Sequence, residues 1–357
     1  MWLRNCWYVI AWDHEIPDGG FLARTVLGEP LLVYRRANDA CTVLEDRCCH
    51  RHAPLSRGRR EGDCVRCGYH GLKFGPDGAC VEVPGMERAP ATARVRSYPA
   101  AVKNHWLFVW MGDAALADPQ MLPDNFSCDH PDWKYRPGYM HYPTPYLLIC
   151  DNLLDFSHLT YVHESTLGGS TAIARARPTV TRLSAPGQRG LNVLRRVPGV
   201  PPPPYYSRIR TIEGLVERWF DYDFLLPGTL IMRSGGRPMA DAPDDLSNAV
   251  QLHSCQTLTP ETESTTHYFF QQAHRADQGD ETVTEGIFQS LLTAFEEDRA
   301  MIGAQHRVIA MGPAARMVPL WMDSALLQFR QMIEDEVARE AANGQASRPS
   351  TDRESRP

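Results

Sequence analysis

Two short runs decide how the N-terminal part of this chain folds: Cys48-Cys49-His50-Arg51-His52-Ala53-Pro54-Leu55-Ser56 and Cys64-Val65-Arg66-Cys67-Gly68-Tyr69-His70-Gly71-Leu72. They contain C-x-H and then, after sixteen further residues, C-x-x-H. A [2Fe–2S] cluster with two thiolates on one iron and two imidazoles on the other takes its ligands from two loops in this way. Two neutral imidazoles also remove negative charge from such a cluster and raise its reduction potential. The pattern therefore predicts an electron store that passes electrons to a second metal.

A zinc site is the alternative, because zinc also binds Cys and His. Cys48 and Cys49 together with Cys64 and Cys67 offer a four-sulfur or mixed ligand set. The pairing of C-x-H with C-x-x-H, and Gly71 directly after the second histidine, favour the cluster. The other cysteines are interpreted as small buried hydrophobic residues: Cys6, Cys41, Cys80, Cys128, Cys150 and Cys255.

Composition is that of an ordinary globular protein, with 43% hydrophobic and 22% charged residues over 357 positions. A net charge of -6 gives no electrostatic reason to expect nucleic acid or an anionic membrane as a partner. The sequence contains no run of about 18 apolar residues, so it predicts no membrane-spanning helix. The N-terminus does not resemble a signal peptide. We therefore expect a cytoplasmic protein, in which ten cysteines are not a disulfide framework.

Short β-rich runs fill the chain up to about residue 110, and turn signals separate them. The runs are 21–27, 30–34, 40–45, 72–74, 80–83 and 105–111. Gly75-Pro76-Asp77-Gly78 is a strong hairpin turn. The sequence predicts an all-β first domain over residues 1–112.

The remainder predicts an α+β domain over residues 113–342 and a disordered tail over 343–357. A Pro- and Asp-rich connector to about Pro137 precedes helical spacing over 147–162. Strand-like runs follow at 216–226, 229–233, 249–258 and 265–272, then helices over 282–310 and 324–342. Residues 165–206 are rich in Gly, Ser, Arg and Pro, which indicates either a mobile cover over a pocket or a solvated loop.

A second metal site is indicated by N-x-x-D-x-x-H-x-x-x-x-H over residues 152–163. Two histidines and one carboxylate on one face of an iron leave the opposite face open for O₂. Asp155 and His158 share one side of a helix, but His163 lies about 140° further round. The helix must therefore end or distort near Tyr161. Alone, the pattern is more typical of ordinary partly buried polar residues, but its occurrence with the upstream cysteines and histidines favours a metal.

The run C-x-H-R-x-A-P-L-S followed by C-x-Y-H-G-L resembles the Rieske motif of the aromatic-ring and methyl-group oxygenases. The resemblance implies two ligands for each iron: Cys48 and Cys67 on one, His50 and His70 on the other. Two positions depart from the family pattern. Cys49 stands where most relatives have Pro, and Cys64 replaces an aliphatic residue. Neither change removes a ligand, so both cysteines are interpreted as bystanders.

The resemblance extends to the second site and is strongest to the vanillate O-demethylase and toluenesulfonate methyl-monooxygenase branch. It implies that His158 and His163 bind iron and that Asn152 and Asp155 are the polar pair beside it. The segment 295–301, Phe-Glu-Glu-Asp-Arg-Ala-Met, resembles the family's F-x-E-D-x-x-M, which points to Asp298 as the third ligand. Without the family, Asp298 and its two neighbouring glutamates indicate only a solvated acidic patch.

The resemblance further implies a helix-grip (START-like) catalytic domain and a homotrimer. The cluster of one subunit would face the mononuclear iron of the next, with Asp155 bridging His70 of one protomer and His158 of its neighbour. The chain has no G-x-G-x-x-G after a strand. Electrons are therefore expected from a separate NADH-dependent flavin/[2Fe–2S] reductase, which would dock near His50 and His70.

The implied reaction uses O₂ to hydroxylate a methyl or methoxy substituent of an aromatic acid, and a hydroxylated methoxy group then loses formaldehyde. The alternatives are a ring-dihydroxylating dioxygenase, an N-demethylase, or an electron-transfer or regulatory protein that uses the Rieske domain alone. Arg233 is either a partner for a carboxylate or sulfonate or a surface residue. Candidate pocket residues are Ile231, Arg233, Gln256 and Gln289.

Overall fold

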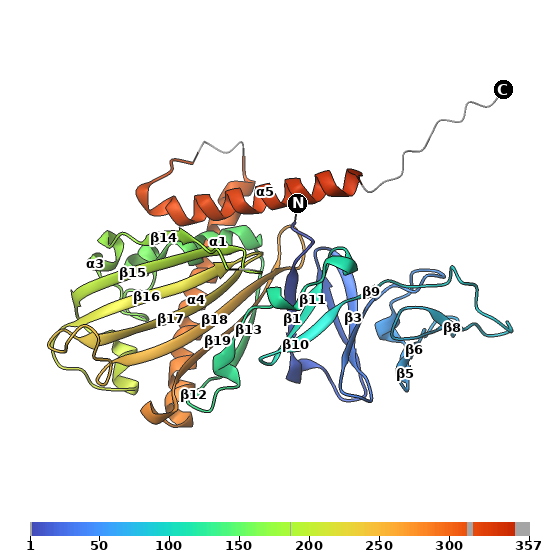
Figure 1. Ribbon diagram of the computed structural model, residues 1–357, viewed down its shortest axis with the longest axis horizontal. Helices are drawn as coiled ribbons and strands as arrows, with labels where there is room; N and C mark the ends of the chain where they lie inside the picture. Colours follow the sequence, from blue (N-terminus) through green and yellow to red (C-terminus); the bar gives the residue numbers. More distant parts are fainter. Residues whose placement is uncertain (1, 186, 313–316, 347–357) are drawn as a thin grey trace.

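The computed structural model describes residues 2–185, 187–312 and 317–346, which form two parts lying end to end (Figure 1). The N-terminal part consists of small antiparallel sheets. The C-terminal part is a long antiparallel sheet with helices packed against it. The predicted fold class, an all-β domain followed by an α+β domain, is confirmed.

The N-terminal part is built from short strands whose tight turns rely on residues with positive φ. Gly78, at φ +79°, completes the predicted turn between β7 and β8. The strands form the sheets β1–β11–β10, β2–β3–β4–β9 and β5–β6–β7–β8. Their bounds are β1 Trp7–Trp12, β2 Leu22–Val26, β3 Glu29–Arg35, β4 Cys41–Glu45, β5 Arg59–Glu61, β6 Cys64–Arg66, β7 Lys73–Phe74, β8 Cys80–Glu82, β9 Ser97–Tyr98, β10 Ala100–Lys103 and β11 Trp106–Trp110, with 3₁₀ turns η1 Asp13–Glu15 and η2 Leu55–Arg57.

The C-terminal sheet has the order β12–β19–β18–β17–β16–β15–β14, and β13 also pairs with β19. Alternate residues of β16 are buried, as expected where one face of the sheet is covered. β18 and β19 are buried at nearly every position, because the N-terminal part packs on their other face. The bounds are β12 Trp133–Lys134, β13 Pro137–Tyr142, β14 Thr179–Arg182, β15 Gly190–Val200, β16 Val216–Leu225, β17 Thr229–Pro238, β18 Val250–Pro260 and β19 Thr266–Arg275. The connector before β12 carries η3 Ala114–Leu116, η4 Pro119–Met121 and η5 Phe126–Cys128.

The interpretation of residues 165–206 as a cover or loop is wrong for part of the segment. It contains α3 Thr171–Arg175, then β14, then β15, which pairs with β16 along most of its length. The Gly, Arg and Pro content of β15 hides an alternating burial pattern, since Leu191, Val193 and Val197 face the core. Only pairing with β16 makes this a strand.

Two short and two long helices complete the C-terminal part. The short ones are α1 Tyr146–Leu154 and α2 Leu159–Val162, and the long ones are α4 Glu281–Ala310 and α5 Ser324–Ala346. The 3₁₀ turns are η6 Phe156–His158, η7 Pro204–Arg208, η8 Ala276–Gln278 and η9 Trp321–Asp323. Phe295 of α4 packs on Tyr268 and Phe270 of β19, with ring centroids 5.1 and 4.9 Å apart. Helix α5 ends four residues later than predicted, so the first four residues of the predicted tail are helical; 347–357 lie outside the described residues.

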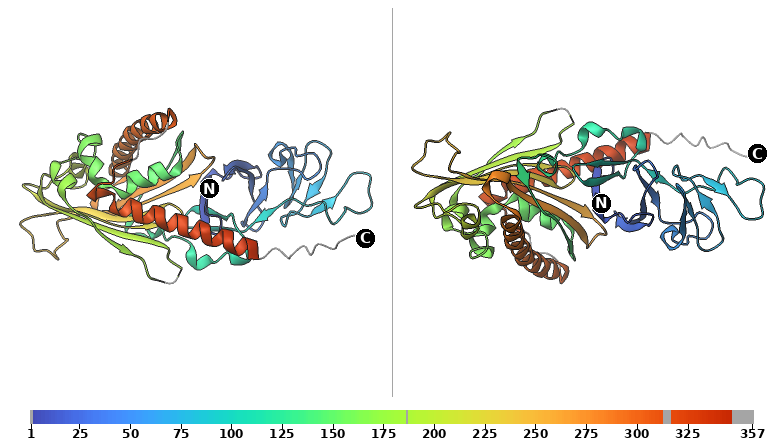
Figure 2. Two further views of the ribbon diagram at one scale, coloured as in Figure 1. Left: turned by 90° about the horizontal axis from the view of Figure 1, so that it is seen from above. Right: turned by 90° about the horizontal axis from the view of Figure 1, so that it is seen from below.

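The two parts share a packed interface. Trp7 and Trp110 belong to the same buried cluster as Cys255 and Phe269 of the long sheet. Figure 2 shows α5 running from the sheet toward the N-terminal part, where Glu340 accepts a 2.9 Å hydrogen bond from the backbone N–H of Arg4. The chain's start is thereby fixed against its last helix.

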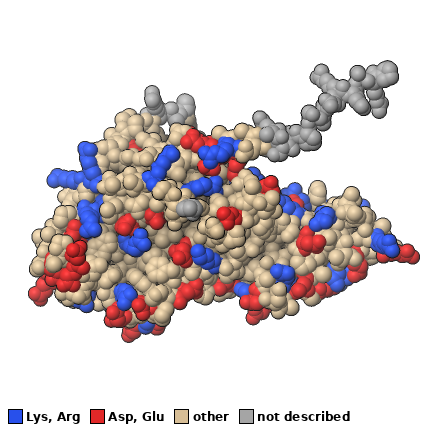
Figure 3. Space-filling model, viewed as in Figure 1, with Lys and Arg blue, Asp and Glu red and all other residues tan. Residues whose placement is uncertain are grey.

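Charged side chains of both signs are interspersed over the face of the molecule in Figure 3. This distribution agrees with the small net charge of -6. Among the residues that the structure describes, no helix combines the length and apolar character needed to cross a membrane.

Candidate metal centres

The candidate cluster ligands lie on two adjacent loops at the tip of the N-terminal part. The side chains of Cys48 and Cys67 are buried, at 2% and 3% exposure, whereas His50 and His70 are exposed. The two imidazole rings lie against each other with centroids 4.6 Å apart. Two thiols therefore face the protein interior and two imidazoles face its surface.

The two loops have equivalent backbone geometry. The carbonyl of Cys48 accepts a hydrogen bond from the N–H of His52 at 2.9 Å, and the carbonyl of Cys67 accepts one from Gly71 at 3.2 Å. His52 and Gly71 both have positive φ, +57° and +75°. Glycine adopts this conformation without strain. This explains why a glycine, Gly71, follows the second histidine. In His52 the same conformation strains the backbone, and other contacts of the loop must offset the free energy of that strain.

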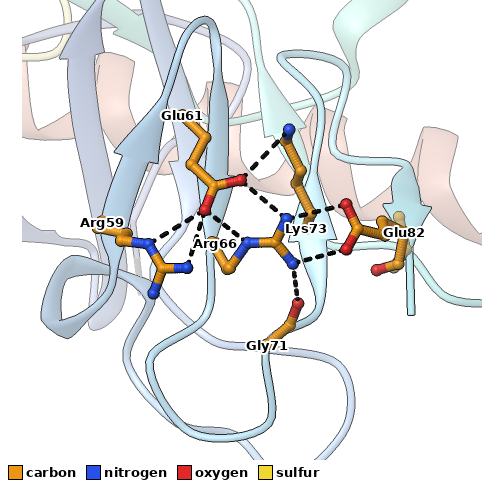
Figure 4. A network of polar contacts seen from close by, with 7 residues as sticks. Arg59, Glu61, Arg66, Gly71, Lys73 and Glu82 are labelled. Carbon is orange, nitrogen blue, oxygen red and sulfur yellow. Dashed lines mark hydrogen bonds and ion pairs between the residues drawn. The ribbon is translucent and has the colours of Figure 1, made fainter. Parts of the chain in front are cut away.

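A charged network supports the second loop (Figure 4). The Arg66 guanidinium donates to Glu61 at 2.7 Å, to Glu82 at 2.8 Å and to the carbonyl of Gly71 at 2.8 Å. Lys73 adds a contact to Glu61 at 3.3 Å. Hydrogen bonds from Arg66 hold the pKa of Glu61 at about 2. Because Arg66 precedes Cys67, this network fixes the loop from its first residue to its last turn.

The spacing of these ligands argues against the zinc alternative. A single zinc ion draws four ligand atoms to within about 2.0–2.3 Å of itself, which brings them close to one another. In the described part of the chain, His158, His163 and Asp298 are the only group of three or more Cys, His or acidic residues whose ligand atoms all lie within 4.8 Å of one another. The ligand atoms around Cys48 and Cys67 do not form such a compact group. Their wider spacing fits a [2Fe–2S] cluster, which is larger than a single zinc ion.

The second candidate centre is formed by those three side chains. The Nε2 atoms of His158 and His163 lie 3.6 and 3.1 Å from Oδ1 of Asp298. His163 and Asp298 are buried, and His158 is partly buried. Asp298 comes from α4, 135 positions beyond His163, so only the packing of α4 against α1 brings the carboxylate to the histidines.

The helix that carries the histidines breaks earlier than predicted. Helix α1 ends at Leu154 and η6 follows, with Asp155 in extended conformation as its N-cap. Helix α2 then ends at Val162, close to the predicted end near Tyr161. The break places the His158 and His163 rings 5.2 Å apart, which a continuous helix cannot do for residues five positions apart.

Each histidine is oriented by an oxygen at Nδ1. Nδ1 of His158 lies 2.5 Å from the backbone carbonyl of Asp155, and Nδ1 of His163 lies 2.7 Å from the Glu297 carboxylate. Carbonyl and carboxylate oxygens accept, so both Nδ1 atoms carry the proton and both Nε2 atoms are free to bind a metal. Glu297 also accepts from Thr166 at 2.8 Å. Asn152 donates to Asp298 at 3.0 Å and orients that carboxylate.

The electrostatics of the two imidazoles differ. Burial lowers the pKa of His158, although Asp298 acts in the opposite direction. Burial also acts to lower the pKa of His163, but the carboxylates of Asp298 and Glu297 outweigh it and the pKa is raised. Glu297, which the sequence offered only as part of an acidic patch, therefore acts directly on a candidate ligand.

The bridge between protomers stays a prediction, and among the described residues the Asp155 carboxylate makes no hydrogen bond to His158. It accepts from the backbone N–H and hydroxyl of Ser157, at 2.9 and 2.6 Å, and lies 3.6 Å from Arg195. The physical reason is its N-cap position, which turns the carboxylate toward the start of η6. The contact to His158 comes from the backbone carbonyl instead.

A cavity adjoins the triad, and Gln256 lines it as predicted. Ile231 and Arg233 do not, because alternate residues of β17 face opposite sides of the sheet and the cavity is lined by Met232 and Ser234. The side chain of Arg233 is 65% exposed. Gln289 lies on the exposed side of α4, where it donates to Glu285 at 2.8 Å.

The sequence reasoning missed Arg218, which lines the cavity from β16. The alternation of residues over 216–224 was the available signal, because it places Arg218 on the same face of the strand as Phe220 and Tyr222. Apolar side chains form most of the remaining wall: Leu153, Phe156, Leu159, Leu167, Phe220, Met232, Leu291 and Phe295.

An all-β domain with a pair of thiol- and imidazole-bearing loops, joined to a domain with two histidines and a carboxylate around a cavity, is the arrangement of a Rieske-type non-haem iron oxygenase. Comparison with known proteins agrees. Residues 6–99 match the Rieske [2Fe-2S] domain family, and residues 142–339 match the vanillate O-demethylase oxygenase C-terminal domain family.

Relatives match along almost the whole chain. The toluene-4-sulfonate monooxygenase system iron-sulfur subunit of Comamonas testosteroni is 45% identical over 94% of this chain and 96% of its own length. The vanillate O-demethylase oxygenase subunit of Pseudomonas sp. (strain ATCC 19151) is 34% identical over 89% and 97%. A crystal structure of dicamba monooxygenase bound to 3,6-dichlorosalicylic acid has a TM-score of 0.85 at 30% identity, covering 95% of this chain and 99% of that one.

The chain therefore belongs to the Rieske oxygenases whose catalytic domain is of the vanillate O-demethylase type. As such it is an oxygenase that contains a Rieske [2Fe–2S] cluster and a mononuclear iron.

Arg66→Met tests the support of the second cluster loop. Removing the guanidinium leaves the Gly71 carbonyl and two carboxylates without their shared donor, so the cluster is expected to be lost several-fold faster on dilution into chelator. The decay of cluster absorbance measures this. Arg59→Met is the matched control, since Arg59 also pairs with Glu61 but makes no contact to Gly71. Equal decay in the two variants contradicts the role given to Arg66.

Glu297→Ala tests the orientation of His163. We expect the affinity for the mononuclear iron to fall about 10- to 100-fold, the usual effect of losing a group that orients a metal-binding histidine. Iron retained after dialysis measures the loss, and the EPR signal of the reduced cluster serves as an internal reference. Glu296→Ala is the control, because the exposed Glu296 pairs only with Arg299 among the described residues. Unchanged iron content in Glu297→Ala refutes the proposed orientation.

Proposed function

We propose that this chain is the oxygenase component of a multi-component system that inserts one oxygen atom of O₂ into a methyl or methoxy substituent of an aromatic acid. The observation that carries the proposal is the buried set of two histidines and one carboxylate beside a mainly apolar cavity. Relatives named for toluene-4-sulfonate, vanillate and dicamba support the substrate class.

In this proposal Cys48 and Cys67 bind one iron of the cluster and His50 and His70 bind the other. The buried position of the thiols and the exposed position of the imidazoles support this assignment, because electrons must enter from a docked protein.

The mononuclear iron is held by His158, His163 and Asp298 in the same proposal. When bound, the cluster stores one electron at a time and the mononuclear iron activates O₂.

The chain's own residues prepare this chemistry. The Asp155 carbonyl and the Glu297 carboxylate hold both imidazoles with Nε2 toward Asp298, and Asn152 holds that carboxylate. These three side chains would hold the metal, and the cavity that they line would receive the substrate. Apolar side chains such as Phe156 and Phe295 exclude water from the substrate.

We further propose that electrons pass between copies of the chain in a homotrimer. The ligand loops near β5–β8 lie at the opposite end of the molecule from α1 and α4 (Figures 1 and 2), which favours transfer to the iron of a neighbouring copy. Asp155 would link the two centres, its carbonyl on His158 and its partly exposed carboxylate toward His70 of the next protomer. A separate NADH-dependent flavin/[2Fe–2S] reductase would supply the electrons near His50.

The test combines the purified oxygenase, a compatible reductase, NADH and O₂ with a panel of methyl- and methoxy-substituted benzoates and benzenesulfonates. Formaldehyde release identifies O-demethylation, and a benzylic alcohol without formaldehyde identifies methyl hydroxylation. Either product supports the proposal. A ring cis-dihydrodiol as the main product favours the dioxygenase alternative, and formaldehyde only from N-methyl substrates favours an N-demethylase.

Asp155→Asn tests the link between the two centres. Both metals are expected to remain bound, because the backbone carbonyl that holds His158 is unchanged. Turnover is expected to fall about 100-fold, since the carboxylate that is proposed to face the His70 imidazole of the neighbouring copy loses its negative charge. Stopped-flow reoxidation of the reduced cluster measures the step directly. Ser157→Ala, which removes a hydrogen bond to the carboxylate but keeps its charge, is the milder control. Cluster reoxidation at the native rate in Asp155→Asn rules out the bridge.

A further inference from the structure

Arg218 occupies a position in the strand that its neighbours fill with apolar side chains. It lies on β16 between Val216 and Phe220, and the inward row continues through Tyr222 and Phe224. Its side chain is among the largest that are fully buried, at 1% exposure. An arginine at a core position of an alternating strand is unusual, because burying a cation is costly unless something compensates its charge.

No acidic partner compensates it within the described part of the chain. The guanidinium donates to two backbone carbonyls, Nη1 to Gly168 at 2.9 Å and Nη2 to Leu167 at 3.3 Å. It also interacts with the neutral hydroxyls of Tyr205 and Tyr206, and it forms no ion pair with a described residue. Its Nε is buried and has no hydrogen-bond partner there. Arginine stays protonated in proteins and offers five N–H donors. The carbonyls and hydroxyls around it are all neutral, so they leave its positive charge without an anionic partner and its Nε without an acceptor.

The unmatched charge borders the cavity of the candidate iron site. Arg218 lines the same cavity as His158, His163 and Asp298. Of the described residues that line it, Arg218 and Asp298 are the only Arg, Lys, Asp or Glu side chains, and Asp298 is turned toward the two histidines. The positive charge is therefore left for whatever occupies the cavity.

Neighbouring groups suit an aromatic anion. The Arg218 guanidinium carbon lies 5.1 Å from the centroid of the Phe220 ring, which supports its flat face. Tyr205 also lines the cavity, and burial raises the pKa of its hydroxyl although Arg218 acts to lower it. Tyr205 therefore remains a neutral donor. A fork of guanidinium donors beside a neutral hydroxyl and an apolar wall matches a carboxylate or sulfonate attached to an aromatic ring.

We propose that Arg218 is the residue that recognises the anionic group of the substrate and so sets the enzyme's preference for aromatic carboxylates and sulfonates. The assignment rests on the proposed function and adds the residue that selects the substrate class. It also replaces Arg233, which lies on the opposite face of the sheet. By fixing the anion, Arg218 positions the ring in the cavity without touching the reacting carbon.

The test is a binding measurement without reductase or O₂. Equilibrium dialysis of the iron-loaded oxygenase compares 4-methylbenzenesulfonate with the neutral 4-methylbenzenesulfonamide, and 4-methylbenzoate with 4-methylbenzamide. For the wild-type chain we expect at least one anion to bind about tenfold or more tightly than its neutral counterpart, as a charge-assisted hydrogen bond supplies. In Arg218→Met the ratio is expected to fall to about one, and in Arg218→Lys to lie between.

Arg233→Met is the matched control, because it removes an exposed arginine from the neighbouring strand and should keep the wild-type ratio. A purely structural role, in which Arg218 only holds the carbonyls of Leu167 and Gly168, weakens anion and amide equally and leaves the ratio unchanged. Iron content and the thermal midpoint of each variant show that the site is intact. If Arg218→Met does not fold, Arg218→Lys and the wild-type ratio still decide the question.

Equal binding of anion and amide by the wild-type chain, or an unchanged ratio in the Arg218 variants, overturns the inference; product formation in the oxygenation assay then leaves the proposed function standing. An Arg218-dependent anion preference supports the inference even where neither formaldehyde nor an alcohol forms, a result that counts against the proposed function alone. The two failures are therefore distinguishable.

Discussion

A buried carboxylate facing two imidazoles is the interaction on which the C-terminal part of this protein depends. Asp298 lies on α4, and its charge is stabilised at this depth by the Asn152 amide and by the imidazoles of His158 and His163. This requires α4 to lie beside α1 and α1 to break at Asp155. The long sheet in turn packs its apolar face against α4. The same packing of α1, α4 and the sheet therefore forms both the fold of this part and its candidate metal site.

The same reasoning distinguishes the charged groups around the cavity. Glu297 is matched by His163 and Thr166, and Asp298 by its amide and imidazole neighbours. Arg218 has only neutral partners within the described residues: two backbone carbonyls, two tyrosine hydroxyls and the face of an aromatic ring. Burying a charge without an opposite partner costs free energy. An unpaired charge at the wall of a cavity therefore indicates that the ligand carries the opposite charge. In the proposed role, the free energy spent on burying Arg218 without an anionic partner favours the binding of acidic aromatic compounds over neutral ones.

Sequence alone located the groups whose spacing is local. C-x-H and C-x-x-H define two loops because each ligand pair is separated by one or two residues, and the short strands around them follow from local turn signals. The break at Asp155 was expected a few residues too late, because its N-cap role depends on Ser157 and Arg195. The strand β15 was missed because its composition resembles a loop until it pairs with β16.

The amino-acid sequence by itself determined the all-β and α+β domains, the two ligand loops, the histidine pair and, through family resemblance, Asp298. Tertiary structure alone decided which charged side chains face the cavity. Ile231 and Arg233 differ from Met232 and Ser234 by one position on the same strand, and a strand alternates its faces at every residue. Which face is covered by α4 depends on packing between segments far apart in the chain. For that reason the position of Arg218 at the cavity emerged from the folded molecule. The contact of Glu297 with His163 likewise depends on where α4 packs.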